Sequence, residues 1–190
     1  RRQRQMCIRD RDKRAMNDIS ALREMSDIPN LGGTAGSTVG AFRKGLDILA
    51  EKADVDIQLL AIPGMKNSAI TDHAIDKTED RFDALYIMDI PAYDQEDKIF
   101  KGLTGTNVSV INTAKQLQDR NLDSSFAAAY FPNVMMADPY TPGISVEAPP
   151  SCVVLGAMAF NDSVAHPWYA PAGFTRGTLQ TVTDGTVIFD

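Results

Sequence analysis

Cysteine, histidine and long apolar runs are all scarce in this 190-residue sequence. The cysteines are Cys7 and Cys152, the histidines are His73 and His166, and none of them lies in a cluster with metal-ligand spacing. A zinc site is therefore not expected. The longest apolar runs, such as residues 152–159, fall well short of the roughly 20 residues that cross a membrane. The sequence thus predicts no membrane-spanning segment and no insertion into a membrane.

The common phosphate-binding and nucleophile motifs are also missing. Residues 32–37 (GGTAGS) form a glycine-rich loop ahead of an expected helix, where free backbone amides can bind phosphate. A P-loop needs a lysine directly after its last glycine, but the first lysine after Gly36 is Lys44. A dinucleotide-binding loop follows a strand and spaces its glycines differently. No G-x-S-x-G nucleophile elbow occurs either, so we interpret the loop as a structural turn.

Two histidines and a group of carboxylates remain as candidates for chemistry. His73 lies in an expected helix and is interpreted as a packing residue, whereas His166 is far in the sequence from any candidate nucleophile. Asp89 ends an expected strand, at the sheet edge where α/β sites usually form. A divalent cation could bind it together with the acidic residues that follow, but a solvated acidic loop is the simpler interpretation of Asp94, Glu96 and Asp97. We therefore assign no catalytic, cofactor-binding or metal-binding residue and expect no cofactor.

Charge is distributed unevenly along the chain. Residues 1–14 hold seven Arg or Lys against two Asp, a net charge of +5, so the remaining residues carry −11 of the total of −6. An acidic body does not favour nucleic acid or an anionic membrane as a partner. The basic start contains QMCIRDR, which resembles a translated sequencing-adapter read-through, and we interpret residues 1–14 as a non-native segment. Without Cys7 the chain has a single thiol, and no internal disulfide is expected.

Residues 15–190 are interpreted as one α/β domain, because a chain of this length forms one substantial hydrophobic core more readily than two. Short apolar runs alternate with amphipathic segments. Successive parallel strands need crossover connections, usually helices. The sequence therefore predicts a doubly wound, mostly parallel sheet with helices on both faces. The expected strands of this sheet are residues 56–62, 84–90 and 126–131.

Capping residues and prolines set the expected boundaries of the helices. The first helix is capped at Ser37 or Thr38 and runs to about Ala53; the second begins at Asn67 or Ser68 and ends near Arg81; the third is capped near Thr106 or Asn107. Residues 152–160 follow two prolines and are interpreted as a helix, with a strand as the alternative. Residues 178–182 and 186–189 are expected to close the domain as a hairpin or strand pair around Asp184-Gly185.

Six local signatures occur in the order in which phage tail sheath proteins have them. The most specific is HPWYAPAG at residues 166–173, which resembles the W-x-A-P-A loop of that family, and APPSCVVLGA at residues 148–157 resembles its PPS segment. The other four are LGGTAG (31–36), VDIQLLAIPG (55–64), RFDALYIMDIP (81–91) and SSFAAAYFP (124–132). The chain is similar to a contractile tail sheath protein over most of its length after residue 30.

This resemblance implies the subtilisin-like sheath domain for residues 15–190, named for its fold and without a working Asp-His-Ser triad, with the family's C-terminal domain missing from the chain. It implies a structural subunit of the virion tail, assembled in the host cytoplasm, and not an enzyme. Implied partners are other copies in stacked hexameric rings, the tail tube protein, and the baseplate and tail terminator proteins. Contraction of such a sheath drives the tube through the host envelope.

Two other hypotheses remain open from the sequence. The first is a fragment of an α/β hydrolase-like or nucleotide-binding enzyme, which the glycine-rich loop and the fold class suggest. The second is a binding module with an unknown ligand. A fold class alone establishes neither.

Overall fold

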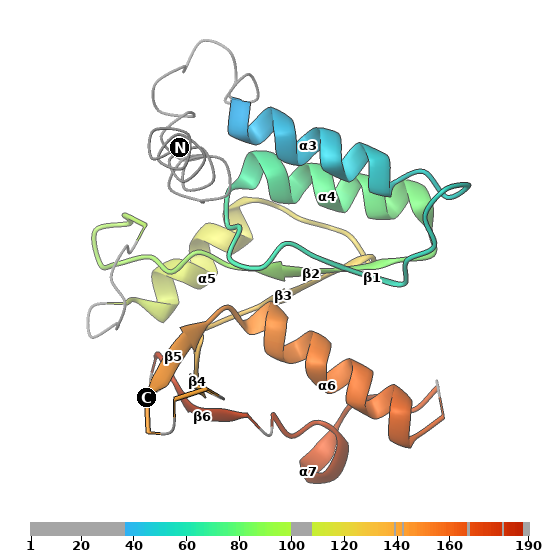
Figure 1. The fold of residues 1–190 in the computed structure, drawn as a ribbon. Coiled ribbons are helices and arrows are strands. Elements are labelled where there is room, and N and C mark those ends of the chain that lie inside the picture. Colours follow the sequence, from blue (N-terminus) through green and yellow to red (C-terminus); the bar gives the residue numbers. More distant parts are fainter. Residues whose placement is uncertain are drawn as a thin grey trace, which may run out of the picture. The chain divides into compact units, whose positions relative to one another are not determined.

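The computed structural model describes residues 37–99, 108–138, 140–141, 143–166, 168–179 and 181–187 (Figure 1). These residues fall into two compact units, the first made of residues 37–60 and 65–86, the second of residues 61–64 and the described residues from 87 onward. The boundary passes through two strands, β1 (Leu59–Ala61) and β2 (Leu85–Asp89). Each of these strands therefore contributes residues to both units. The glycine-rich loop up to Gly36 and the segment 1–14 lie outside the described residues.

The described chain is a mixed α/β structure with two three-stranded sheets. The first sheet is parallel, in the order β1-β2-β3, with β3 at Ala127–Tyr130. The predicted α/β class and the three predicted parallel strands are thus confirmed, each strand being somewhat shorter than expected. The second sheet is antiparallel and was not predicted; its order is β5-β4-β6, with β4 at Val134–Ala137, β5 at Ser145–Ala148 and β6 at Val182–Gly185.

Two helices make up most of the first unit, α3 (Ser37–Leu49) and α4 (Ser68–Arg81). Figure 1 shows α3 lying along α4, and the two helices are in contact. Val39 and Leu46 of α3 are buried, as are Ile70 and Ala74 of α4, so each helix turns an apolar stripe inward. Helix α4 begins as predicted, because the Asn67 side chain caps it by accepting a hydrogen bond from the backbone N–H of Ala69 at 2.9 Å.

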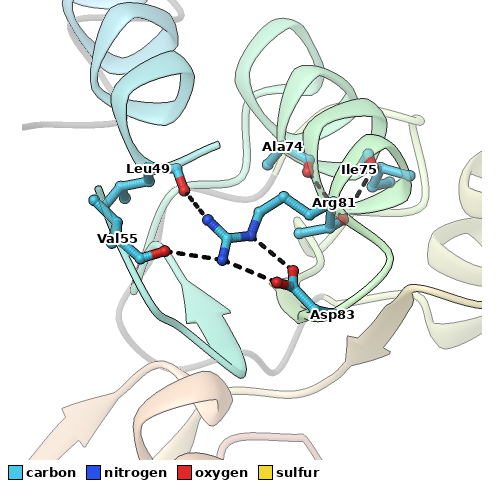
Figure 2. A network of polar contacts seen from close by, with 7 residues as sticks. Leu49, Val55, Ala74, Ile75, Arg81 and Asp83 are labelled. Atoms are coloured by element: carbon cyan, nitrogen blue, oxygen red, sulfur yellow. Dashed lines mark hydrogen bonds and ion pairs between the residues drawn. The ribbon is translucent and has the colours of Figure 1, made fainter. Parts of the chain in front are cut away.

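Helix α3 ends at Leu49, four residues before the predicted end at Ala53, and Arg81 supplies the reason (Figure 2). Its Nη1 donates to the carbonyl of Leu49 at 2.6 Å, and its Nη2 donates to the carbonyl of Val55 at 3.0 Å. The same guanidinium forms a fork with the Asp83 carboxylate, at 2.9 and 3.3 Å. Because Arg81 comes from the end of α4, these contacts fix the loop between α3 and β1 against the first unit's second helix.

The second unit contains three helices, α5 (Val110–Asp119), α6 (Pro150–Val164) and α7 (Gly173–Arg176). The expected cap of α5 near Thr106 or Asn107 lies outside the described residues. The helix starts at Val110, and the Ser109 hydroxyl accepts the capping hydrogen bond from the Asn112 N–H. Helix α6 confirms the helical interpretation of residues 152–160. It carries proline at its first position, where the missing N–H costs nothing. The short helix α7 was not predicted.

The predicted hairpin around Asp184-Gly185 was wrong. Both residues belong to β6, which pairs antiparallel with β4 so that Met135 lies opposite Asp184 and Val134 opposite Gly185. A register shift between Met135 and Met136 interrupts this pairing. The turn propensity of Asp-Gly is therefore overridden by pairing with a strand about 50 residues earlier in the chain.

Candidate functional site

A buried polar cluster within the second unit surrounds the carboxylate of Asp89. Asp89 ends β2, as predicted, and is 2% exposed. Its Oδ2 accepts hydrogen bonds from the backbone N–H of Gly64 at 2.9 Å and from the Ser151 hydroxyl at 2.7 Å. Its Oδ1 accepts one from the backbone N–H of Ser151 at 2.9 Å. We refer to Gly64, Asp89 and Ser151 as the Asp89 cluster.

The local sequence explains why Ser151 needs a partner from elsewhere in the chain. The N-terminal backbone amides of a helix have no partner within the helix. In α6 the N-cap is Pro149, which has no polar side chain, and the next residue is Pro150, which has no N–H. Asp89 takes over the role of the capping side chain, and its negative charge also meets the positive end of the helix dipole.

The same geometry makes Ser151 unsuitable as a nucleophile. Its side chain is fully buried, and its hydroxyl donates directly to a carboxylate with no histidine between them. A serine hydrolase needs an exposed hydroxyl whose proton passes to a positioned base. In the Asp89 cluster, the carboxylate instead accepts its hydrogen bonds from the start of α6 and from the turn at Gly64. These bonds hold the helix and the turn to the end of β2.

The two histidines have partners of their own. His73, on α4, bonds through Nε2 to Asp47 of α3 at 2.8 Å, and Lys77 lies 3.5 Å from the same carboxylate. The hydrogen bond with His73 lowers the pKa of Asp47, partial loss of hydration opposes this shift, and Lys77 lowers the pKa further. His166 follows α6 and stacks on the indole ring of Trp168, with ring centroids 4.6 Å apart. His73 thus serves helix packing, as predicted.

The acidic residues after Asp89 do not join it. Asp94 accepts hydrogen bonds from the backbone N–H groups of Glu96 and Lys98, both at 2.9 Å, and so closes a turn on itself. Lys98 pairs with Glu96 at 2.7 Å on the surface. Within the ranges that the structure describes, no group of three His, Cys, Asp or Glu side chains comes together as a metal site would require. The interpretation as a solvated acidic loop accounts for the observed contacts.

An apolar cavity of about 290 Å³ lies in the second unit, between α6, β4 and the segment that follows α7. Met136, Gly156, Phe160 and Leu179 line it, together with Cys152. Burial raises the pKa of the Cys152 thiol, and the nearby charge of Asp89 raises it further. Cys152 is nevertheless an exposed free thiol, and its raised pKa means that less of it is present as the nucleophilic thiolate.

Sequence reasoning singled out Asp89 but missed its partners. Two signals pointed toward them: Asp89 closes an apolar strand, and Pro149-Pro150 leaves a helix start without a cap. Neither signal says that the two meet, because the partners lie 25 and 62 residues away in the chain. Only the structure reveals that the residues of the Asp89 cluster meet.

Comparisons with models of protein families, with curated proteins and with solved structures found no match for this chain. Among the helices of the described residues, none has the length and apolar character that crossing a membrane requires.

Proposed function

We propose that this chain is a structural subunit of a contractile phage tail sheath, polymerising around the tail tube and contracting to drive it through the host envelope. The observation that carries the proposal is that the segments resembling sheath proteins meet at the Asp89 cluster. Gly64 ends the first strand signature, Asp89 belongs to the second, and Ser151 belongs to the PPS segment. Residues that bind one another in this way are expected of a structural subunit.

The third strand signature joins the same region. The backbone N–H of Ile90 donates to the carbonyl of Tyr130 at 3.2 Å, next to Asp89. Four of the six signatures therefore contribute hydrogen bonds within one part of the second unit. Their role in holding strands and a helix together accounts for the sequence pattern without invoking catalysis.

The finer fold belongs to this proposal. The chain order β1-α4-β2-α5-β3 is one that doubly wound, subtilisin-like domains contain, although the three strands β1-β2-β3 do not themselves include the reversal of strand order that defines such a fold. In that arrangement helices cover both faces of the sheet. We propose this arrangement for residues 15–190, with the antiparallel sheet β5-β4-β6 as an addition to it.

A sheath of this kind does mechanical work through its contacts. Subunits in stacked hexameric rings exchange one set of contacts for a better one on contraction, so the energy is stored in the assembled lattice and no cofactor is needed at firing. The partners are other copies of the chain, the tail tube protein, and the baseplate and tail terminator proteins. The location is the virion tail, after assembly in the host cytoplasm.

Co-expression with the tail tube protein of the same genome tests the proposal. The expected product is tubes or stacked rings in electron micrographs, with this chain on the outside of the tube. The decisive contrary result is a chain that neither polymerises nor binds the tube when its complete open reading frame is expressed.

The alternative, a hydrolase-like or nucleotide-binding enzyme fragment, predicts a different result. Calorimetry with ATP, GTP and NAD, and esterase and peptidase assays, are expected to show neither binding nor turnover. Saturable nucleotide binding that Gly33→Ala abolishes would favour the enzyme. A matched control is Gly40→Ala in α3, a position with open space around the added methyl group.

A further inference from the structure

Large apolar side chains are exposed where α6 ends and around α7. Phe160, Trp168, Tyr169 and Phe174 are 39%, 76%, 44% and 99% exposed, and we call these four residues the aromatic face. They lie within 15 residues of one another in the second unit. Contacts link them: Asn161, next to Phe160, donates to the carbonyl of Tyr169 at 2.7 Å, and α6 contacts α7. Exposed apolar patches of this kind mark interaction surfaces.

Two side chains of the aromatic face, Trp168 and Tyr169, are held in place even though they are exposed. His166 stacks on Trp168, and Trp168 and Tyr169 have ring centroids 6.4 Å apart. The guanidinium of Arg176 lies 4.8 Å from the centroid of the Tyr169 ring. A surface that is already ordered loses little conformational entropy on binding. Tryptophan, tyrosine and arginine are also the residue types enriched at the energetic centre of protein interfaces.

The cavity between α6, β4 and the segment after α7 adjoins this face, since Phe160 belongs to both. Its described lining contains no charged residue, so an apolar group that enters it displaces no ionic hydration. Its volume, about 290 Å³, exceeds the roughly 150 Å³ that accommodates benzene in a protein interior. The cavity is therefore large enough to receive the ring of a phenylalanine side chain.

We propose that the aromatic face and this cavity form a self-interface, in which Phe174 of one copy enters the cavity of a second copy. Phe174 is 99% exposed, and the segment that lines the cavity follows α7 directly. One surface thus carries both the projecting ring and the cavity. This inference rests on the proposed sheath function, and it names which part of the chain meets a neighbouring subunit.

The available area fits an interface between copies. At 150–250 Å² per aromatic side chain, the exposed portions of the four residues amount to roughly 500 Å². A stable interface buries about 800 Å² on each partner. The aromatic face alone supplies more than half of that area, and the cavity walls around Phe160 and Leu179 add to it.

Sedimentation velocity over a concentration series tests the proposal with the 190-residue chain. The wild type is expected to self-associate, and Phe174→Asp is expected to weaken the dissociation constant at least about tenfold. Ile111→Asp is the matched control, because Ile111 is 81% exposed on α5 and lies outside the aromatic face. Circular dichroism checks that the variants stay folded. We expect Phe174→Asp to fold, because the Phe174 side chain is exposed.

A second variant acts on the cavity. Gly156 lines it, and a methyl group added there meets no atom within 4 Å, so Gly156→Leu places a side chain in the cavity without a backbone clash. Gly156→Leu alone is expected to lose association as Phe174→Asp does. In a mixture of the two variants, Gly156→Leu supplies an intact Phe174 ring and Phe174→Asp supplies an intact cavity. The mixture is therefore expected to form heterodimers.

A wild type that stays monomeric at every concentration overturns the proposal, and so does equal loss of association in Ile111→Asp. Failure of the mixed variants to form heterodimers overturns the insertion of Phe174. Assembly on the tail tube tests the proposed function separately from the proposed interface. If Phe174→Asp assembles on the tube as well as the wild type, the interface is wrong and the sheath function stands. If the chain self-associates through Phe174 but never binds the tube, the interface stands and the sheath function fails.

Discussion

The Ser151 hydroxyl lies 2.7 Å from Oδ2 of Asp89, across 62 residues of sequence, and both side chains are buried. A buried carboxylate is stable only when hydrogen bonds or opposite charges replace its lost hydration. Here the helix start provides two donors, and the turn at Gly64 provides a third. The Asp89 carboxylate therefore holds helix α6 and strand β2 together.

Asp89→Asn is expected to lower the free energy of unfolding by about 2–4 kcal/mol, because the amide removes the charge and turns its NH2 group toward one of two N–H donors, that of Gly64 or that of Ser151. Denaturant unfolding followed by circular dichroism measures this change. Asp76→Asn, at an exposed position of α4, is the control and is expected to stay within about 0.5 kcal/mol of the wild type. Equal stability of the two variants would contradict the anchoring role of Asp89.

Arg81→Lys is expected to cost about 2–3 kcal/mol, since an ammonium group cannot reach the carbonyls of Leu49 and Val55 while also forming the fork with Asp83. Arg43→Lys provides the matched comparison, because Arg43 is half-buried and, within the described part of the chain, donates one hydrogen bond of 3.1 Å, to the carbonyl of Ala69. Its expected cost is within about 1 kcal/mol. Thermal melts of both variants decide whether the network in Figure 2 is required for stability.

The Asp47 pair predicts a small pH dependence of stability. His73 and Lys77 lower the pKa of Asp47, so the folded state favours the ionised carboxylate. The stabilisation is present above the unfolded pKa of 3.8 and is lost as pH falls through the lower folded pKa. Because Asp47 is half exposed, its size is expected to be a few tenths of a kcal/mol. Asp47→Asn should be less stable than the wild type at about pH 6 and equal to it at about pH 2.

Cys152 is expected to react slowly with iodoacetamide at neutral pH. Its pKa is raised by burial and by the charge of Asp89, so less thiolate is present than for an ordinary cysteine. Peptide mass spectrometry after timed alkylation measures the rate, and the unfolded protein serves as the reference. A folded-state rate at about pH 7 equal to the unfolded one would show that the thiol environment has no effect.

The parts of the fold that the sequence predicted depend on local signals. Helix α4 lies where Asn67 and Arg81 placed it, because a side-chain cap acts within one helical turn. The three parallel strands follow from short apolar runs ended by proline or a polar turn, and β2 is buried along most of its length, from Tyr86 to Asp89. Caps and short apolar runs of this kind determine whether a segment forms a helix or a strand.

What the sequence did not predict depends on residues far apart in the chain. Helix α3 stops early because Arg81 binds the Leu49 carbonyl, 32 residues away. Strands β4 and β5 are four residues each and carry no strong pattern of their own, so their pairing with each other decides their structure. The Asp89 cluster depends in the same way on partners that no local motif contains.

The order in which these residues are synthesised gives Asp89 a further consequence. As the chain emerges from the ribosome, β2 is complete 62 residues before Ser151 has been made. Until then Asp89 has only the Gly64 amide as a partner from this cluster, and burying it would leave the charge undersatisfied. The second unit therefore closes late, once α6 exists. A product truncated before α6 would keep the apolar side of β2 open to chaperones and proteases, so the cluster couples burial of this core to completion of the chain.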